Sequence, residues 1–249
     1  MSCLALNSCD PWEDDSYHEG GGSNGTLLKE VHTTSAGVEG LATYTYDANG
    51  RMIGVIAYAD ILDMESYSQT IQTYTGDTNV HSVTKSYLAG VLTTTTTVNS
   101  QVNGNLVNMT MSMDDGSGQT IDSTMEITFE LPCGVQQNAM STTMPGFPDP
   151  IESLTTYEYT DVNCSSKEYV NGDLSTTTTM DGKISPFSTP ESIAMGVTSH
   201  NPVKIENAAD GSVETITYTY NEQDYPIKAV HTFSQGSGQA DYTEEFTYY

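Results

Sequence analysis

The feature that most constrains the fold is a succession of short segments in which apolar residues mostly alternate with threonine and other polar residues. Alternation with a period of two is typical of β-strands that bury one face. Turns such as DANG (47–50) and ADGS (209–212) separate these segments and supply the Asn, Asp and Gly that tight hairpins require at positive φ. The strand segments that we expect are 41–46, 51–58, 82–98, 105–113, 124–131, 175–180, 213–220, 227–233 and 242–249.

Helical periodicity is weak along the whole chain. Only ADILDMESYSQTIQTY (59–74) could carry one short helix. We therefore predict an all-β fold, an antiparallel meander of repeated β-hairpins that forms an extended, curved sheet or a sandwich, with at most one short helix. Residues 27–249 are expected to form this body as a single β-rich domain.

Parts of the chain are similar to one another. TYTYDANGRMIGVIAY (43–58) aligns with ITYTYNEQDYPIKAVHTF (216–233), a fainter copy occupies 155–170, and EEFTYY (244–249) looks like a copy cut off at the chain end. Repeated hairpins of this kind add strands to one sheet, each of which needs its neighbours to bury an apolar face.

The alignment also predicts which side chains share a face. Tyr44 and Tyr46 correspond to Tyr218 and Tyr220. Because side chains alternate along a strand, each pair lies on one face, which we expect to be partly buried, while the intervening threonines point to the other side. Packing in the sheet is the first role expected of these rings, and stacking of sugars is the second.

The first 26 residues do not resemble a strand. LNSC (6–9) resembles a lipobox, in which the cysteine is acylated after the preceding signal peptide is cleaved. Residues 1–8 are too few for a complete signal peptide and contain no Lys or Arg, so we expect either that the precursor begins upstream or that the chain was trimmed. Residues 9–26 would then be a lipid anchor at Cys9 and a flexible, acidic and glycine-rich tether. The alternative is an intracellular protein with LNSC present by chance.

An acidic cluster follows the candidate anchor. It consists of Asp10, Glu13, Asp14 and Asp15. Acidic residues in this position resemble the signal that sends Bacteroidota lipoproteins to the cell surface, whereas a solvated tail on the periplasmic leaflet is the alternative. We therefore expect an outer-membrane protein that is lipid-anchored and displayed at the cell surface.

The N-terminus and the repeats together suggest a family. At YTYDANGR the chain resembles the tyrosine–aspartate repeats of Rhs-type shell proteins. With the lipobox and NPVKIENAADGSVETITYTYNEQDYPIK (201–228), it is similar to uncharacterised outer-membrane lipoproteins of Bacteroidota. The resemblance covers both ends of the chain well and residues 60–150 poorly. It implies an extended β-sheet body and carries no enzymatic activity with it.

The cysteines are compatible with an anchored protein. Cys3 would leave with the signal peptide and Cys9 would carry the lipid, so Cys133 and Cys164 remain as an even pair. A non-cytoplasmic compartment permits a disulfide between them, and two lone buried thiols are the alternative. Neither cysteine lies in a CxxC motif or near a histidine with ligand spacing, so we expect no metal site.

The composition disfavours several classes of partner and function. Asp and Glu number 33 against 7 Lys and Arg, and the net charge of −26 disfavours nucleic acid. No run approaches the eighteen apolar residues that a spanning helix needs, so we expect a soluble body held to the membrane by the N-terminal lipid alone. The five histidines are scattered and no catalytic motif is present, which predicts neither enzymatic activity nor a cofactor.

One short motif suggests a modification. Asp122-Ser123-Thr124 resembles the Bacteroidota signal for O-glycosylation, with Ser123 as the acceptor. Its position, where a strand begins after a glycine-containing turn, suggests an accessible hydroxyl.

The sequence thus predicts a non-catalytic outer-membrane lipoprotein that acts as a structural or binding accessory subunit of a larger cell-envelope complex. The alternative is a glycan-binding or glycan-processing surface lipoprotein that stacks sugars on its aromatic rings. A row of exposed rings on a concave face would favour this alternative, whereas rings buried in the sheet would favour the accessory subunit.

Overall fold

The structure is a computed structural model, and it describes residues 27–76, 78–130, 133–187, 200–234 and 237–249. The candidate lipid anchor Cys9 and the acidic cluster after it lie outside the described residues. Among those residues, no helix is long and apolar enough to cross a membrane.

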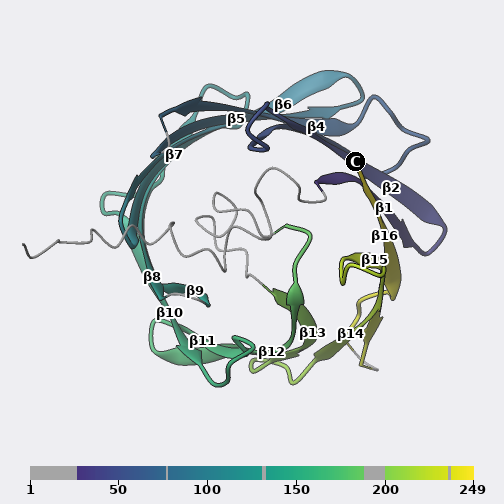
Figure 1. The fold of residues 1–249 in the computed structure, drawn as a ribbon. Helices are drawn as coiled ribbons and strands as arrows, with labels where there is room; N and C mark the ends of the chain where they lie inside the picture. The colour runs from purple at the N-terminus through teal and green to yellow at the C-terminus, as the bar shows by residue number, and fades with distance from the viewer. Residues whose placement is uncertain (1–26, 77, 131–132, 188–199, 235–236) are drawn as a thin grey trace, which may run out of the picture.

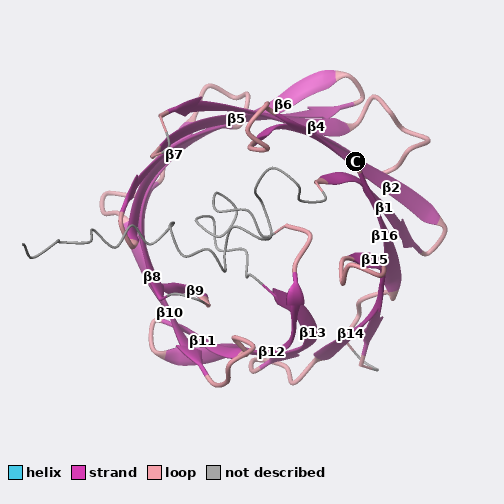
Figure 2. Ribbon diagram, viewed as in Figure 1, coloured by secondary structure: helices cyan, strands magenta, loops and turns pink. Residues whose placement is uncertain are grey.

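Sixteen antiparallel strands form one closed barrel, in which every strand pairs with its neighbours in sequence and β16 pairs back with β1 (Figures 1 and 2). The strands are β1 Leu28–Ser35, β2 Val38–Tyr46, β3 Met52–Tyr58, β4 Tyr67–Thr75, β5 Asn79–Leu88, β6 Val91–Asn103, β7 Leu106–Asp114, β8 Thr120–Glu130, β9 Gly134–Thr143, β10 Ile151–Tyr159, β11 Ser166–Val170, β12 Asp173–Ile184, β13 His200–Asn207, β14 Val213–Tyr220, β15 Pro226–Phe233 and β16 Tyr242–Tyr248.

Closure corrects the predicted architecture. An extended sheet or a sandwich would leave edge strands, but β1 and β16 pair from Leu28 opposite Tyr248 to Ser35 opposite Tyr242. The last segment, β16, is therefore paired on both sides, with β15 and with β1. Pairing the two edges satisfies backbone groups that an open meander leaves to solvent.

The predicted helix at 59–74 is also wrong. Residues 59–66 form turns, and Tyr67–Thr75 is β4, which pairs with β3 on one side and β5 on the other. YSQTIQTYT is rich in β-branched and aromatic residues, and pairing with a strand on each side prevails over the weak helical pattern. No helix occurs in the described part of the chain.

The sequence repeats are equivalent hairpins at one end of the barrel, which we call the N-terminal rim because β1 begins there. In the turn between β2 and β3, Oδ1 of Asp47 accepts hydrogen bonds from the backbone amides of Asn49 (2.8 Å) and Arg51 (2.9 Å). In the turn between β14 and β15, Oδ1 of Asn221 accepts the equivalent pair of bonds, at 3.0 Å each. Both hairpins also share a β-bulge after the second threonine of the repeat.

The fainter copy is a third hairpin of the same type. Oδ1 of Asp161 accepts from the backbone amides of Asn163 (2.9 Å) and Ser165 (3.1 Å) between β10 and β11. The fourth residue of each turn adopts positive φ, and it is Gly50, Cys164 or Asp224. Side-chain capping by Asp or Asn therefore fixes the same turn with three different residues at the left-handed position.

One cavity identifies the inner face of the barrel. It is lined by side chains from eight consecutive strands, β9 to β16, and by residues 185–187 from the connection after β12, which enters the ring in Figure 1. Side chains on the convex outside diverge, so a cavity shared by eight strands lies inside. Residues paired across a ladder point to the same face, so the register extends this assignment around the ring.

The repeat tyrosines lie on this inner face, as the alternation predicts. Tyr218 lines the cavity, and Tyr44 pairs with the inward-facing Val55. Thr45 and Thr219 take the opposite, outer face. Three further tyrosines at the N-terminal rim donate hydrogen bonds of 2.7 Å to backbone carbonyls of the preceding strand: Tyr74 to Met52, Tyr159 to Val135 and Tyr248 to Pro226.

Candidate functional site in the barrel lumen

The outer face of the barrel is polar. Threonine is its commonest residue, as in β14, where Thr215, Thr217 and Thr219 all face outward. Charged side chains occur on the outer face around the ring: Glu30, Lys85, Glu126, Glu158, Lys167, Lys204, Glu206, Lys228 and Glu245. A barrel that crosses a bilayer presents an apolar band about 25 Å tall to the lipid. This outer face does not provide such a band.

One row of apolar and aromatic side chains on the outer face lies on β2 to β6. Leu41, Tyr58, Tyr67, Tyr87 and Leu92 pair in one row across β2 to β6, near the rim opposite the N-terminal one. The rings of Tyr67 and Tyr87 stack on each other with centroids 4.6 Å apart. This row lies on a convex face and its rings cover one another, so it is not the concave platform that the glycan alternative calls for.

The inner face combines mainly hydroxyl side chains on β4 to β6 with two buried apolar clusters. One cluster joins Val107, Ile127, Phe129 and Val135 on β7 to β9. A second joins Leu28, Val31, Ile216, Ala229 and Phe246 on the two sides of the seam between β1 and β16. Both clusters point inward, whereas the interior of a transmembrane barrel is polar.

Methionines extend the first cluster. Met109, Met125 and Met140 pair in one row across β7, β8 and β9, and Met109 and Met125 pack against the cluster. Methionine is unbranched and polarisable, and it adapts to apolar partners of different shape. We call the inner faces of β7 to β9 the methionine wall.

The cavity occupies the other side of the lumen and has a volume of about 470 Å³, within the range of small-molecule sites. Phe187 reaches into the lumen, and its ring lies 6.3 Å from those of Tyr44 and Phe246. Tyr157, Tyr159, Tyr218 and Tyr242 add four more rings to the lining. The cavity is therefore bounded mainly by aromatic and aliphatic groups.

Ionisable side chains also face the cavity. The carboxylate of Glu214 on β14 accepts a hydrogen bond of 2.6 Å from Nδ1 of His231 on β15. Glu244 on β16 lies 3.4 Å from Nε2 of the same ring. The ring of His231 stacks on Tyr242, with centroids 4.0 Å apart. Burial acts to lower the pKa of His231, but the two carboxylates outweigh it and raise the pKa above its ordinary value. The two carboxylates thus favour the protonated form of the imidazole.

The phenols of the lumen remain protonated over a wide pH range. Burial, with a smaller contribution from Glu244, raises the pKa of Tyr44 to about 12. Burial and then the carboxylate of Glu168 raise the pKa of Tyr157 to about 12. These hydroxyls can therefore donate hydrogen bonds without adding charge to the lumen.

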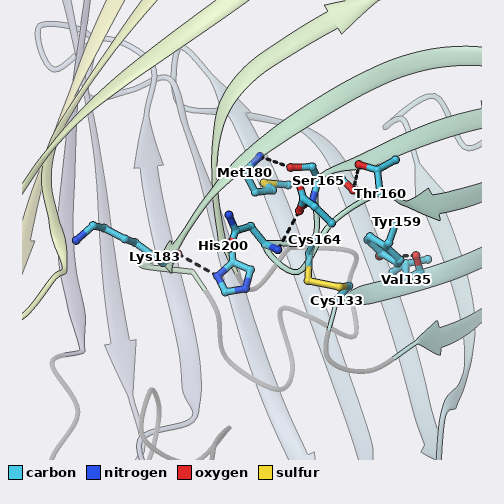
Figure 3. Close-up of a disulfide and its surroundings, with 11 residues drawn as sticks. Cys133, Val135, Tyr159, Thr160, Cys164, Ser165, Met180, Lys183 and His200 are labelled. Atoms are coloured by element: carbon cyan, nitrogen blue, oxygen red, sulfur yellow. Dashed lines mark hydrogen bonds between the residues drawn. A yellow bond between two sulfur atoms is a disulfide. The ribbon is translucent and has the colours of Figure 1, made fainter.

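The structure joins Cys133 and Cys164 in a disulfide, which is the pair that we expect from the sequence. Their Cα atoms lie 5.1 Å apart and both side chains are buried. Figure 3 shows that the bond connects the turn before β9 to the turn before β11, at the N-terminal rim. Beside it, Oγ of Ser165 accepts a hydrogen bond from the backbone amide of Met180 at 3.0 Å (Figure 3).

The candidate glycosylation site is not exposed. Ser123 is 4 % exposed, faces the lumen and shares a hydrogen bond of 2.9 Å with the hydroxyl of Thr142. The expected accessibility is wrong because Ser123, unlike Asp122 before it, falls on the inward phase of β8. A transferase could reach this hydroxyl only before the barrel folds.

The lumen residues were not singled out from the sequence, although a signal for them exists. Glu214 and Glu244 occupy the same alternation phase as Ile216 and Phe246, so each is a carboxylate at a position where the pattern places a buried apolar residue. His231 likewise follows the buried Ala229 by two residues. In the described residues, no group of three or more His, Cys, Asp and Glu side chains is arranged to hold a metal ion.

Comparison with known proteins identifies the fold. No family model and no curated protein matches the chain. A solved structure of a porin-like protein from Bacteroides uniformis aligns with a TM-score of 0.56 at 13 % identity, over 89 % of this chain and 96 % of that one. A porin-like protein from Bacteroides vulgatus aligns with a TM-score of 0.47 at 8 % identity, over 90 % of this chain and 99 % of that one. The chain therefore has the barrel fold of a porin-like protein.

Proposed function

We propose that this protein is an outer-membrane lipoprotein whose barrel stands in water and binds an apolar or amphiphilic molecule in its lumen. The single observation that carries the proposal is the polarity of the wall, which is polar outside and carries two buried apolar clusters inside. The proposal keeps the predicted role of a non-catalytic binding accessory in the cell envelope. It adds a location for the binding site, namely the lumen.

The name of the two similar structures suggests a pore, but the side chains of this chain argue against one. Lys or Arg facing lipid at the bilayer midplane costs roughly 2–4 kcal/mol, and here Lys85, Lys167, Lys204 and Lys228 all face outward. A lumen that conducts ions is polar, whereas the methionine wall and the second cluster line this one. Apolar surface of that kind gains free energy when an apolar ligand replaces water.

Binding is tested with the full chain carrying Cys9→Ser, which cannot be acylated. We expect it to be soluble without detergent and to enhance the fluorescence of the apolar probe N-phenyl-1-naphthylamine. Met125→Gln places an amide on the methionine wall and should weaken probe binding about fivefold or more, because a polar group loses hydrogen bonds to water there. The control Thr124→Gln, whose side chain faces outward, should leave probe binding unchanged. Stepwise conductance in planar bilayers without probe binding would instead identify a pore.

The lipid anchor is a separate part of the proposal, supported by the lipobox resemblance at 6–9. In cells, Cys9→Ser should move the protein from the membrane fraction to the soluble fraction, because the polar barrel wall offers no other attachment. Replacing Asp10, Glu13, Asp14 and Asp15 with Ala should preserve membrane attachment but reduce digestion by external protease. Fatty-acid labelling of the Cys9→Ser protein would rule out this anchor. Unchanged digestion of the alanine variant would show that the acidic cluster is only a solvated tail.

A further inference from the structure

The two sides of the lumen differ in charge. Glu168, Glu214, Glu244 and His231 line the cavity on the β11 to β16 side. The inward positions of β6 to β9 carry only apolar, hydroxyl and amide side chains, among them the methionine wall. The lumen is thus amphiphilic, with an apolar side that faces an ionisable one.

The ionisable side has more negative than positive charge. Three carboxylates line the cavity, and within the described residues that line it His231 is the one group that can be cationic. Glu214 lies 2.6 Å and Glu244 3.4 Å from the two ring nitrogens of His231, so one imidazole serves two carboxylates, and Glu168 adds a third to the lining. A carboxylate held away from bulk water favours a nearby positive charge, so the cavity attracts cations and repels anions.

The histidine itself is incompletely bonded. His231 is 5 % exposed, and its Nε2 makes no hydrogen bond within the described residues although Glu244 Oε2 lies 3.4 Å away. Glu244 is therefore held less closely by the ring than Glu214 is, and its carboxylate can accept a hydrogen bond from a further donor.

Aromatic rings surround the same carboxylates. Tyr218, Tyr242, Phe246 and Phe187 line the cavity together with Glu214 and Glu244. Amines and quaternary ammonium groups are recognised by ring faces combined with carboxylates, because the ring quadrupole attracts a cation without the desolvation cost of a second full charge. An anionic or purely apolar head group would gain nothing from this combination.

Building on the lumen-binding function proposed above, we infer that the ligand is an amphiphile with a cationic amine or quaternary ammonium head group. The head group lies beside Glu244 and the rings around it, and the alkyl tail lies against the apolar inner wall. This assignment uses both sides of the lumen, which neither a small cation nor a hydrocarbon alone would do.

The test compares three ligands with the same dodecyl tail, each below its critical micelle concentration: dodecyltrimethylammonium, dodecyl maltoside and dodecanoate. Isothermal titration of the full chain carrying Cys9→Ser should give at least tenfold tighter binding for the cationic ligand than for dodecanoate. Glu244→Gln should weaken binding of the cation about tenfold and leave dodecyl maltoside unchanged. Glu245→Gln is the matched control, because its side chain follows directly in β16, faces outward and pairs with Lys228.

The outcomes separate the two proposals. If all three ligands bind with equal affinity, the lumen takes alkyl chains and the head-group assignment is wrong. If Glu244→Gln and Glu245→Gln lose the same affinity for the cationic ligand, the overall negative charge attracts the cation, which also overturns the assignment. If none of the dodecyl ligands binds, the proposed lumen-binding function is itself wrong.

Discussion

Replacing Ile127 with lysine is expected to abolish the folded barrel or to destabilise it by more than about 4 kcal/mol, whereas the same change at Thr128 should cost less than about 0.5 kcal/mol. The two residues are adjacent in β8, and Ile127 is 3 % exposed and faces the lumen. A lysine there would bury an ammonium group among Val107, Phe129 and Val135, on the side of the lumen whose inward positions carry no carboxylate. At Thr128 the ammonium group would extend into water.

Denaturant unfolding of the full chain carrying Cys9→Ser measures both effects. Because Ile127→Lys could fail to fold, Ile127→Ala provides a measurable companion, and it should lose roughly 2–4 kcal/mol through the cavity that it leaves. In a barrel that faces lipid, the order of the two lysine variants would be the reverse, since the outward position would bear the cost. A larger loss at Thr128 than at Ile127 would therefore refute the water-facing wall.

Removal of the disulfide is the second change with a large expected effect. Cys133 and Cys164 close a loop with a sequence separation of 31 residues. For a loop of this length, the chain-entropy estimate of the stabilisation is about 3.7 kcal/mol. We expect the double variant Cys133→Ala and Cys164→Ala to lose roughly 2–4 kcal/mol in denaturant unfolding, because the unfolded chain then regains that freedom.

The matched control is Met64→Ala, a change of an exposed residue on a turn far along the chain from either cysteine. It should leave the free energy of unfolding within about 0.5 kcal/mol of the parent chain. Alkylation of the native protein gives an independent check. Ready labelling of both thiols without reductant would show that the bond does not form.

Local features of the fold could be predicted from the sequence because local chemistry determines them. The alternation in VETITYTY sets the inward phase of Ile216 and Tyr218, and the Asp or Asn after each tyrosine pair sets the turn. The same alternation would serve an open sheet, a sandwich or a barrel equally well. What separates them is whether Val31 faces Phe246, a pairing of two segments more than 200 residues apart that no local pattern encodes.

The candidate site could be predicted only in part for a similar reason. The pair of cysteines is found by elimination, and the inward tyrosines follow from the repeats. The cluster of Glu214, His231 and Glu244 is assembled by the pairing of β14 with β15 and of β15 with β16. Before those ladders are known, Glu214 is one of 33 acidic residues, and its place in the apolar phase of a strand is the one property that distinguishes it.

The seam between β1 and β16 also has a consequence for how the chain assembles. Fifteen of the sixteen ladders join strands that are consecutive in sequence, and these can form as local hairpins. The seam joins Leu28 with Tyr248, which lie at opposite ends of the barrel sequence, so its formation has the largest loop-closure entropy cost. We therefore expect it to form last. Until then β1 and β16 are both unpaired edges with complementary registers, and β1 of one chain can pair with β16 of another. Refolding at high protein concentration should therefore divert chains into swapped dimers, whereas dilution should favour closure of the ring within one chain.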